Sequence, residues 1–94
     1  MASEINIDSK LSIPPQVLSR LVGDETVLLD LFKGVYFGLD GVGKRIWETV
    51  AEGHSLAQTA TVISAEYEVD HERAQADVIE FACKLVERGL LETQ

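Results

Sequence analysis

A change of hydrophobic period between residues 26 and 47 constrains the fold of this chain more than any other feature. The stretch reads TVLLDLFKGVYFGLDGVGKRIW. The runs Val27–Leu31 and Val35–Leu39 each alternate with the period of two that is typical of strands, and Phe32-Lys33-Gly34 between them fits a turn. After Leu39 the apolar residues recur at helical spacing. The stretch therefore predicts a β-hairpin that runs directly into a helix.

The second strand of this hairpin, Val35–Leu39, is the last one before the chain leaves the sheet. One of its edges is therefore expected to have no partner within the chain. An open edge exposes backbone N–H and C=O groups, and its commonest use is to accept an extended peptide as an added strand. Gly38 supports this expectation, because a glycine inside a strand often marks the close approach of another backbone.

The first two helices are predicted by their N-terminal caps and their apolar stripes. Asp40 is suited to cap the first helix, in which Val42, Ile46 and Val50 share one face and Trp47 lies beside them. Gly53 ends that helix. Ser55 and Gln58 then have the spacing of a capping box, which marks the start of the second helix.

The third predicted helix begins after Asp70, as its cap, and ends near Arg88, with Gly89 as the C-terminal residue. It has an unusually wide apolar face. One arc holds Ala74, Val78, Phe81, Ala82 and Leu85, and a second arc holds Ile79, Cys83 and Val86. A helix that buries one stripe needs only about 100° of its circumference. The surplus suggests either two apolar neighbours, one of them the sheet or a ligand, or a helix that is core all round.

The length of 94 residues fits one domain that buries roughly 60–65% of its extended surface. Gln16–Val22 is predicted as a first strand, so the main domain is expected at residues 16–92. Residues 1–15 are expected to form an N-terminal arm or an extra strand that ends at Pro14-Pro15. The fold class is α+β, with a three-stranded antiparallel sheet followed by three helices in a winged helix-turn-helix-like order.

Charge and composition narrow the classes of partner. The net charge of −8 would repel nucleic acid. The longest apolar runs are only a few residues, so no membrane span is expected. The N-terminus lacks the pattern of a secretory signal, and a single cysteine, Cys83, fits a reducing compartment. We therefore expect a cytoplasmic protein.

Residues for catalysis or metal binding do not gather in the sequence. His54 and His71 are far apart and lack cysteine partners at the spacing of a zinc site, and Cys83 lies on an apolar arc. The glycines at 34, 38, 41 and 43 do not have the spacing of a phosphate-binding loop. We expect no metal, no cofactor and no enzymatic activity.

The order of elements is also that of a winged-helix DNA-binding protein, in which the third helix would enter a DNA groove. From Asp70 to Arg88 that helix carries five acidic and three basic residues, which gives 3 − 5 = −2. A negatively charged reading helix argues against nucleic-acid binding.

The motifs resemble those of the PqqD-like family, whose members are small recognition domains for ribosomally made precursor peptides. The resemblance covers roughly residues 16–92 and rests on LLDLFKGVYFGLDGVGKRIW, TVAEGHSLAQTATVISAEYEVDHE and DVIEFACKLVERGLL. Its most specific parts are Tyr36-Phe37-Gly38-Leu39-Asp40, Ile46-Trp47 and Asp77-Val78. YFGLD followed by GxxIW is most similar to the stand-alone leader-binding proteins of lasso peptide biosynthesis. Position 40 is often Asn in the wider family, and Asp caps a helix equally well.

This resemblance implies a non-catalytic adaptor that binds the leader segment of a precursor peptide by β-strand addition. The leader would lie between the third strand and the third helix, and the adaptor would present it to a leader-cleaving cysteine protease and an ATP-dependent cyclase. The expected peptide-binding residues are Val35, Tyr36, Phe37, Gly38, Leu39, Ala74, Asp77, Val78, Phe81 and Leu85. The alternatives are a peptide chaperone of pyrroloquinoline quinone biosynthesis and, third, a winged-helix nucleic-acid-binding protein.

Overall fold

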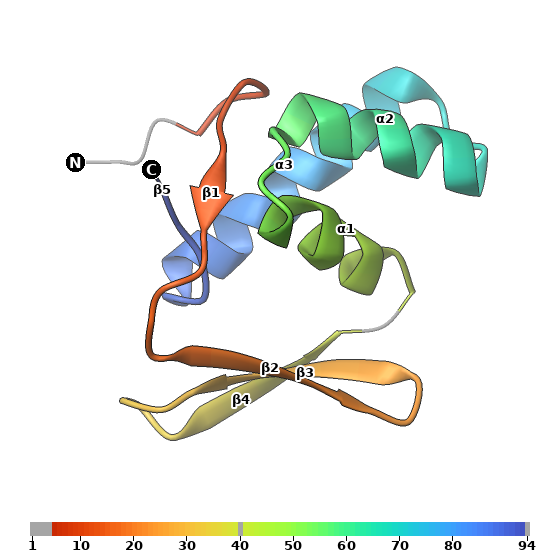
Figure 1. Ribbon diagram of the computed structural model, residues 1–94. Coiled ribbons are helices and arrows are strands. Elements are labelled where there is room, and N and C mark those ends of the chain that lie inside the picture. Colours follow the sequence, from red (N-terminus) through yellow and green to blue (C-terminus); the bar gives the residue numbers. More distant parts are fainter. Residues whose placement is uncertain (1–4, 40, 94) are drawn as a thin grey trace.

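The computed structural model describes residues 5–39 and 41–93. A three-stranded antiparallel sheet lies on one side of the molecule, and three helices are stacked on one of its faces (Figure 1). The elements in chain order are β1 (Leu11–Ser12), β2 (Val17–Val22), β3 (Glu25–Asp30), β4 (Val35–Leu39), α1 (Gly41–Ala51), α2 (Leu56–Tyr67), α3 (His71–Glu87) and β5 (Glu92–Thr93). The predicted α+β order of a sheet followed by three helices is confirmed.

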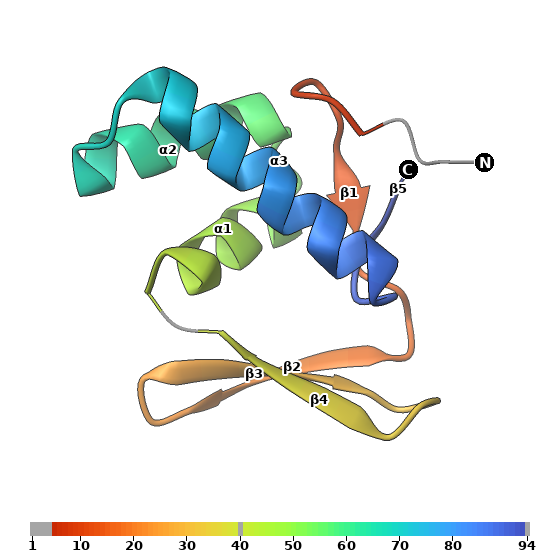
Figure 2. The ribbon, with the colours of Figure 1, turned by 180° about the vertical axis from the view of Figure 1, so that it is seen from behind.

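The sheet has the order β2-β3-β4, so β2 and β4 are its two edges. Side chains alternate between its faces, and Thr26, Leu28 and Asp30 of β3 are buried toward the helices. Phe37 and Leu39 of β4 share that face, because they pair with Leu28 and Thr26. No helix formed by the described residues covers the other face of the sheet (Figure 2).

The loop between β3 and β4 is organised by Asp30. Its buried carboxylate accepts hydrogen bonds from the backbone N–H groups of Phe32 at 2.9 Å and Lys33 at 3.1 Å. The N–H of Gly34, which has a φ of 72°, donates to the carbonyl of Asp30 at 2.8 Å. Strand β3 therefore ends at Asp30, one residue before the predicted end, and Leu31 belongs to the loop.

The core lies between the sheet and the helices, and also between the helices themselves. Trp47 is 3% exposed, as predicted for a core residue. Helix α2 begins with the predicted capping box, in which Ser55 and Gln58 bond each other's backbone N–H groups at 3.1 and 2.8 Å. A bidentate contact joins α1 to α2: Arg45 donates to Glu66 at 2.9 and 3.0 Å.

The predicted ends of α1 and α3 are only partly confirmed. The expected cap of α1, Asp40, lies outside the described residues. Asp70 occupies the cap position of α3, but its side chain makes no capping hydrogen bond, so the predicted side-chain cap is wrong. Its backbone carbonyl instead accepts the N–H of Ala74 at 2.9 Å. At the other end, Gly89 has a φ of 77° and follows the helix as predicted.

The N-terminal segment from residue 5 onward packs against the helices. Leu11 is 2% exposed, and β1 pairs with β5 near the C-terminus rather than joining the three-stranded sheet (Figure 1). The carbonyls of Ile7 and Ser9 accept the N–H groups of Ala57 at 2.7 Å and Leu56 at 3.0 Å. These bonds satisfy donors in the first turn of α2, which have no partners within the helix.

Candidate functional site

The outer edge of β4 is open along its length in the described part of the chain. Its free hydrogen-bonding groups follow from the register of the sheet. The N–H of Leu31 donates to the carbonyl of Gln16, and in an antiparallel sheet the backbone groups of successive residues point alternately to opposite sides. By this alternation Leu28 and Asp30 direct their backbone groups toward β4, where their partners Phe37 and Val35 bond back to β3. The N–H and C=O groups of the intervening residues, Tyr36 and Gly38, therefore point away from β3. The edge thus presents two donors and two acceptors to a further strand.

A groove runs beside this edge and is built by three elements. Strand β4 contributes Phe37, Gly38 and Leu39, helix α1 contributes Val42, Gly43 and Ile46, and helix α3 contributes Asp77 and Phe81. Leu39 and Ile46 are each 3% exposed and form its floor, whereas Phe37 and Phe81 are half-buried walls. The lining is mainly apolar, with one carboxylate at the rim.

Two aromatic contacts define the groove. The Phe81 ring lies against Gly43 of α1, where only a hydrogen stands in place of a side chain. The guanidinium carbon of Arg88 lies 5.1 Å from the centroid of the Phe37 ring, which is the distance of a cation–π contact. Arg88 follows the last turn of α3 and Phe37 is in the middle of β4, so this contact ties the helix end to the strand.

The rim of the groove along α3 is charged. Asp77 is exposed and lies 3.7 Å from the guanidinium of Arg73, one turn earlier. Asp77 and Phe81 also line an adjoining hollow with Glu80 and Lys84. The apolar floor is therefore bordered by two acids and one base on the helix side. This arrangement suits a peptide that places apolar side chains inside and polar ones along the rim.

The residues expected from the sequence fall into three groups. Five line the groove: Phe37, Gly38, Leu39, Asp77 and Phe81. Val35 and Tyr36 are 52% and 75% exposed on β4 but lie outside its lining, and Tyr36 is on the face of the sheet that carries no helix. Ala74, Val78 and Leu85 are each 0% exposed. These three form the stripe of α3 that packs into the core, so in the unbound chain they offer no surface to a peptide.

Sequence reasoning missed the contribution of α1. The sequence places Val42 and Ile46 on the apolar stripe of the first helix and gives Gly43 no role in binding. Ile46 is indeed buried, but Val42 is 38% exposed and faces the groove. The signal was present in the short spacing between the strand and the helix, because a single residue separates Leu39 from Gly41. A strand and a helix that lie this close in sequence bring the first turn of α1 beside the end of β4.

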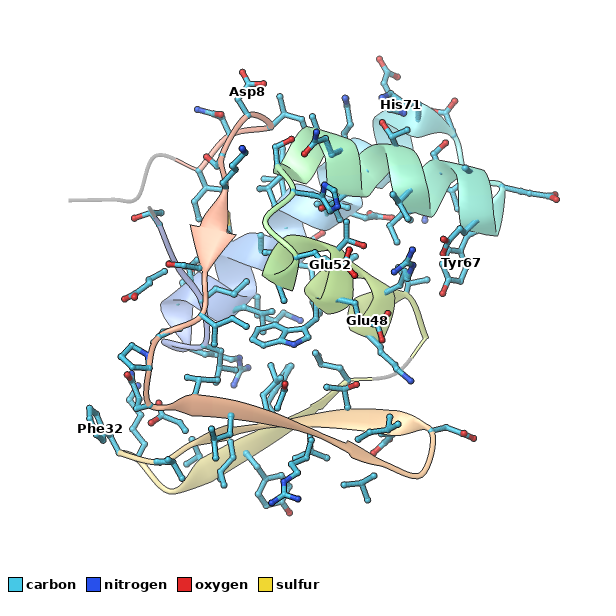
Figure 3. The ribbon with its side chains drawn as sticks, viewed as in Figure 1. Asp8, Phe32, Glu48, Glu52, Tyr67 and His71 are labelled. Atoms are coloured by element: carbon cyan, nitrogen blue, oxygen red, sulfur yellow. The ribbon has the colours of Figure 1, made fainter. Side chains whose placement is uncertain are left out.

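The described residues hold no group of three His, Cys, Asp or Glu side chains able to bind a metal ion. The nearest acidic partner of His54 is Glu52, at 3.6 Å, and His71 is at the start of α3 (Figure 3). Within residues 5–39 and 41–93, no helix is long and apolar enough to cross a bilayer. The groove beside the open edge of β4 is the candidate functional site.

The chain belongs to the PqqD family. The family model described as coenzyme PQQ synthesis protein D matches residues 25–91. No curated protein matches the chain by sequence.

Two solved structures have a similar fold. The chain is 42% identical to TbiB1 in complex with the TbiA(beta) leader peptide; the match covers 86% of this chain and 94% of that one, with a TM-score of 0.81. It is 28% identical to a lasso peptide synthetase B1 complexed with the leader peptide, over 88% and 98% of the two chains, with a TM-score of 0.83. Both similar proteins are thus described as bound to leader peptides.

Proposed function

We propose that this chain is a non-catalytic adaptor that binds the leader of a ribosomally made precursor peptide in lasso peptide biosynthesis. The leader adds to β4 as an antiparallel strand and lies in the groove between β4 and α3. The observation that carries this proposal is the coincidence of an open strand edge with a mainly apolar groove in a fold shared with two leader-binding proteins.

Backbone pairing provides the general part of the affinity. Tyr36 and Gly38 direct their N–H and C=O groups outward, and a strand placed there satisfies them without regard to the peptide's side chains. Selectivity comes from the groove. Because side chains alternate along a strand, every second residue of the leader faces Leu39, Ile46 and Phe81.

The wider partners are those that the family resemblance implies. The adaptor acts in the cytoplasm, where its precursor is synthesised, and presents the bound leader to a cysteine protease and to an ATP-dependent cyclase. A leader held as an extended strand keeps its backbone in a fixed orientation, so the segment that follows it leaves the groove at a defined place.

A second candidate function is that of a peptide chaperone in pyrroloquinoline quinone biosynthesis. One observation favours this function: residues 25–91 match the family model that is described as coenzyme PQQ synthesis protein D. The two functions differ in the peptide that is bound. Direct titration with a lasso leader peptide and with a quinone-precursor peptide separates them by affinity.

The central test is an NMR titration of the isotope-labelled chain with a lasso leader peptide. We expect saturable shifts of the backbone amides of Tyr36 and Gly38 and of groove residues in α1 and α3. A scrambled leader of identical composition is the control and should leave these amides unchanged. Saturable binding without shifts along β4 would contradict strand addition at this edge. Failure of the lasso leader peptide to bind at all would contradict the proposed function.

A further inference from the structure

The three-stranded sheet has a second open edge, on the opposite side from β4. Strand β2 pairs with β3 only, within the residues that the structure describes. The same alternation that frees Tyr36 and Gly38 directs the N–H and C=O groups of Ser19 and Leu21 away from β3. Both residues are exposed, and Leu21 is 67% exposed. An open edge of this kind is normally covered by another element, protected from pairing by charged residues, proline or a bulge, or used for binding.

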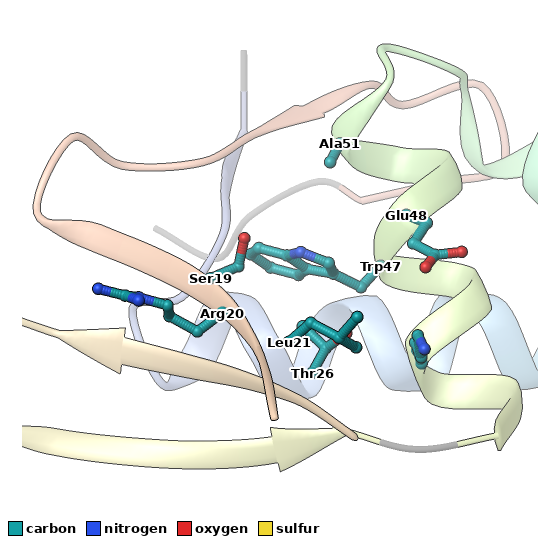
Figure 4. Close-up of a pocket in the computed structure, with 8 residues that line it drawn as sticks. Ser19, Arg20, Leu21, Thr26, Trp47, Glu48 and Ala51 are labelled. Atoms are coloured by element: carbon teal, nitrogen blue, oxygen red, sulfur yellow. The ribbon is translucent and has the colours of Figure 1, made fainter. Parts of the chain in front are cut away.

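A second groove lies beside this edge, between β2 and α1 (Figure 4). It is lined by Ser19, Arg20, Leu21, Thr26, Lys44, Trp47, Glu48 and Ala51. The Trp47 indole extends from α1 toward Ser19 and forms the inner wall, while Leu21 and Ala51 add apolar surface nearer the solvent (Figure 4). Strand β2, like β4, thus has an open edge beside a groove formed with α1, and the lining of this second groove mixes apolar with polar and charged side chains.

The charge of this second groove differs from that of the chain as a whole. The chain has a net charge of −8, yet Arg20 and Lys44 both line this groove. Among residues 5–39 and 41–93, no carboxylate lies within ion-pair distance of either cation. The one lining carboxylate, Glu48, already lies 3.5 Å from the guanidinium of Arg45. The β2 edge therefore offers one cation on each face of the sheet to an incoming negative charge, Lys44 on the helix side and Arg20 on the other.

We propose that β2 is a second strand-addition site, which binds an extended acidic segment of another protein. The segment pairs with the backbone of Ser19 and Leu21, and its carboxylates lie beside Lys44 on the helix side and Arg20 on the opposite face. Side chains on an added strand alternate between these faces, so two adjacent acidic residues reach both cations. The site is at the far edge of the sheet from β4, so both edges can be occupied at once.

A blocked hexapeptide, Thr-Val-Glu-Glu-Val-Thr, is a suitable probe. Its matched controls replace both glutamates with glutamine or with lysine. The readout is an NMR titration of the full chain. The glutamate peptide should shift the amides of Ser19 and Leu21 and those of the facing side of α1, while the amides of Tyr36 and Gly38 stay unshifted. The glutamine peptide should bind about fivefold more weakly, as expected for the loss of two exposed charge pairs. The lysine peptide should not bind at this edge.

Substitution in the protein provides the reciprocal test. The double variant Arg20→Gln and Lys44→Gln should bind the glutamate peptide as weakly as the parent binds the glutamine peptide. The control, Lys10→Gln and Lys33→Gln, removes the same charge from exposed positions outside this groove and should bind like the parent. Equal affinity for the three peptides, shifts confined to β4, or no shifts at millimolar peptide would each overturn the proposal. Leader binding should be unchanged in both variants, which keeps this test separate from that of the proposed function.

Discussion

Phe81 of α3 lies so close to Gly43 of α1 that a Cβ atom placed on the glycine would be 3.1 Å from Cζ of the ring and 3.4 Å from Cε1. The first of these distances is tighter than ordinary van der Waals contact. The absence of a side chain at position 43 therefore sets where the Phe81 ring lies, and with it the width of the groove beside β4.

Gly43→Ala should lower leader affinity without unfolding the chain. The added methyl group pushes the ring toward the groove by a few tenths of an ångström, and we expect a loss of about 1 kcal/mol in binding, roughly fivefold. Stability should change by less than about 1 kcal/mol, because alanine favours a helix over glycine by a similar amount. Peptide titration and thermal melting of the same sample measure the two effects.

The Phe81→Leu background is the control for this crowding, since leucine lacks the ring atoms that the methyl group meets. On that background, the step from Gly43 to Ala should no longer change leader affinity. A loss of affinity that is the same on both backgrounds would mean that the methyl group acts on the peptide directly.

Phe81→Ala should weaken leader binding by about 2 kcal/mol, roughly thirtyfold, because the ring is a half-buried wall of the groove. The matched control is Ile79→Ala, which truncates a half-buried residue of the same helix that does not line the groove. Both variants lose some stability, but only the first should lose affinity. Equal affinities of the two variants, measured at a temperature where both are folded, would remove Phe81 from the site.

Trp47→Ala should destabilise the fold by about 3–5 kcal/mol, because a buried indole is replaced by a cavity. Chemical denaturation followed by circular dichroism measures this loss, since the variant has no tryptophan fluorescence. The effect on leader affinity in the folded fraction should be small, because Trp47 lines the groove beside β2 and not the one beside β4. A variant with parental stability would show that Trp47 is not a core residue.

The sequence predicts most of this fold because its signals are local. The alternation at Val35–Leu39 and the capping box at Ser55 and Gln58 are set by neighbours in the chain, and both are present in the structure. The burial of Asp30 was not predictable in this way. A carboxylate in a strand looks like a solvated side chain until the turn that follows supplies two backbone donors.

The candidate site was harder to predict because it depends on how three elements meet. The width of the apolar arc on α3 was recognised, but periodicity cannot say which part of an arc faces another helix. In the structure Val78 and Leu85 face the core, and Phe81, on the flank, faces the groove. Likewise, the role of Gly43 depends on the position of a ring that is distant in sequence.

The contact between Arg45 and Glu66 should make a small, acid-sensitive contribution to stability. The hydrogen bond from Arg45 lowers the pKa of the Glu66 carboxyl. A lowered folded-state pKa stabilises the fold in full above the ordinary pKa of a glutamate, about 4.3, and this contribution is lost as the pH falls through the lowered value. Glu66→Gln should therefore melt slightly below the parent at neutral pH, and the difference should vanish in acid. The difference in melting temperature between the parent and the variant should also shrink in high salt, because both side chains are partly exposed.

Gly38→Pro should weaken leader binding strongly while the sheet remains folded. Proline removes the N–H of residue 38, which points to the open edge and not into the β3–β4 ladder, and edge strands tolerate proline in this orientation. The control is Gly38→Ala, which keeps the N–H; its Cβ would lie 3.6 Å from Glu25 Oε1, an ordinary contact. The alanine variant should bind like the parent, and the proline variant should lose about 1–2 kcal/mol of affinity, about five- to thirtyfold. NMR spectra of the free variants report the fold, and titration reports binding. Parental affinity in a folded proline variant would show that the N–H of residue 38 is not used by the peptide. An equal loss of affinity in the proline and alanine variants would indicate that the peptide requires the absence of a side chain at position 38.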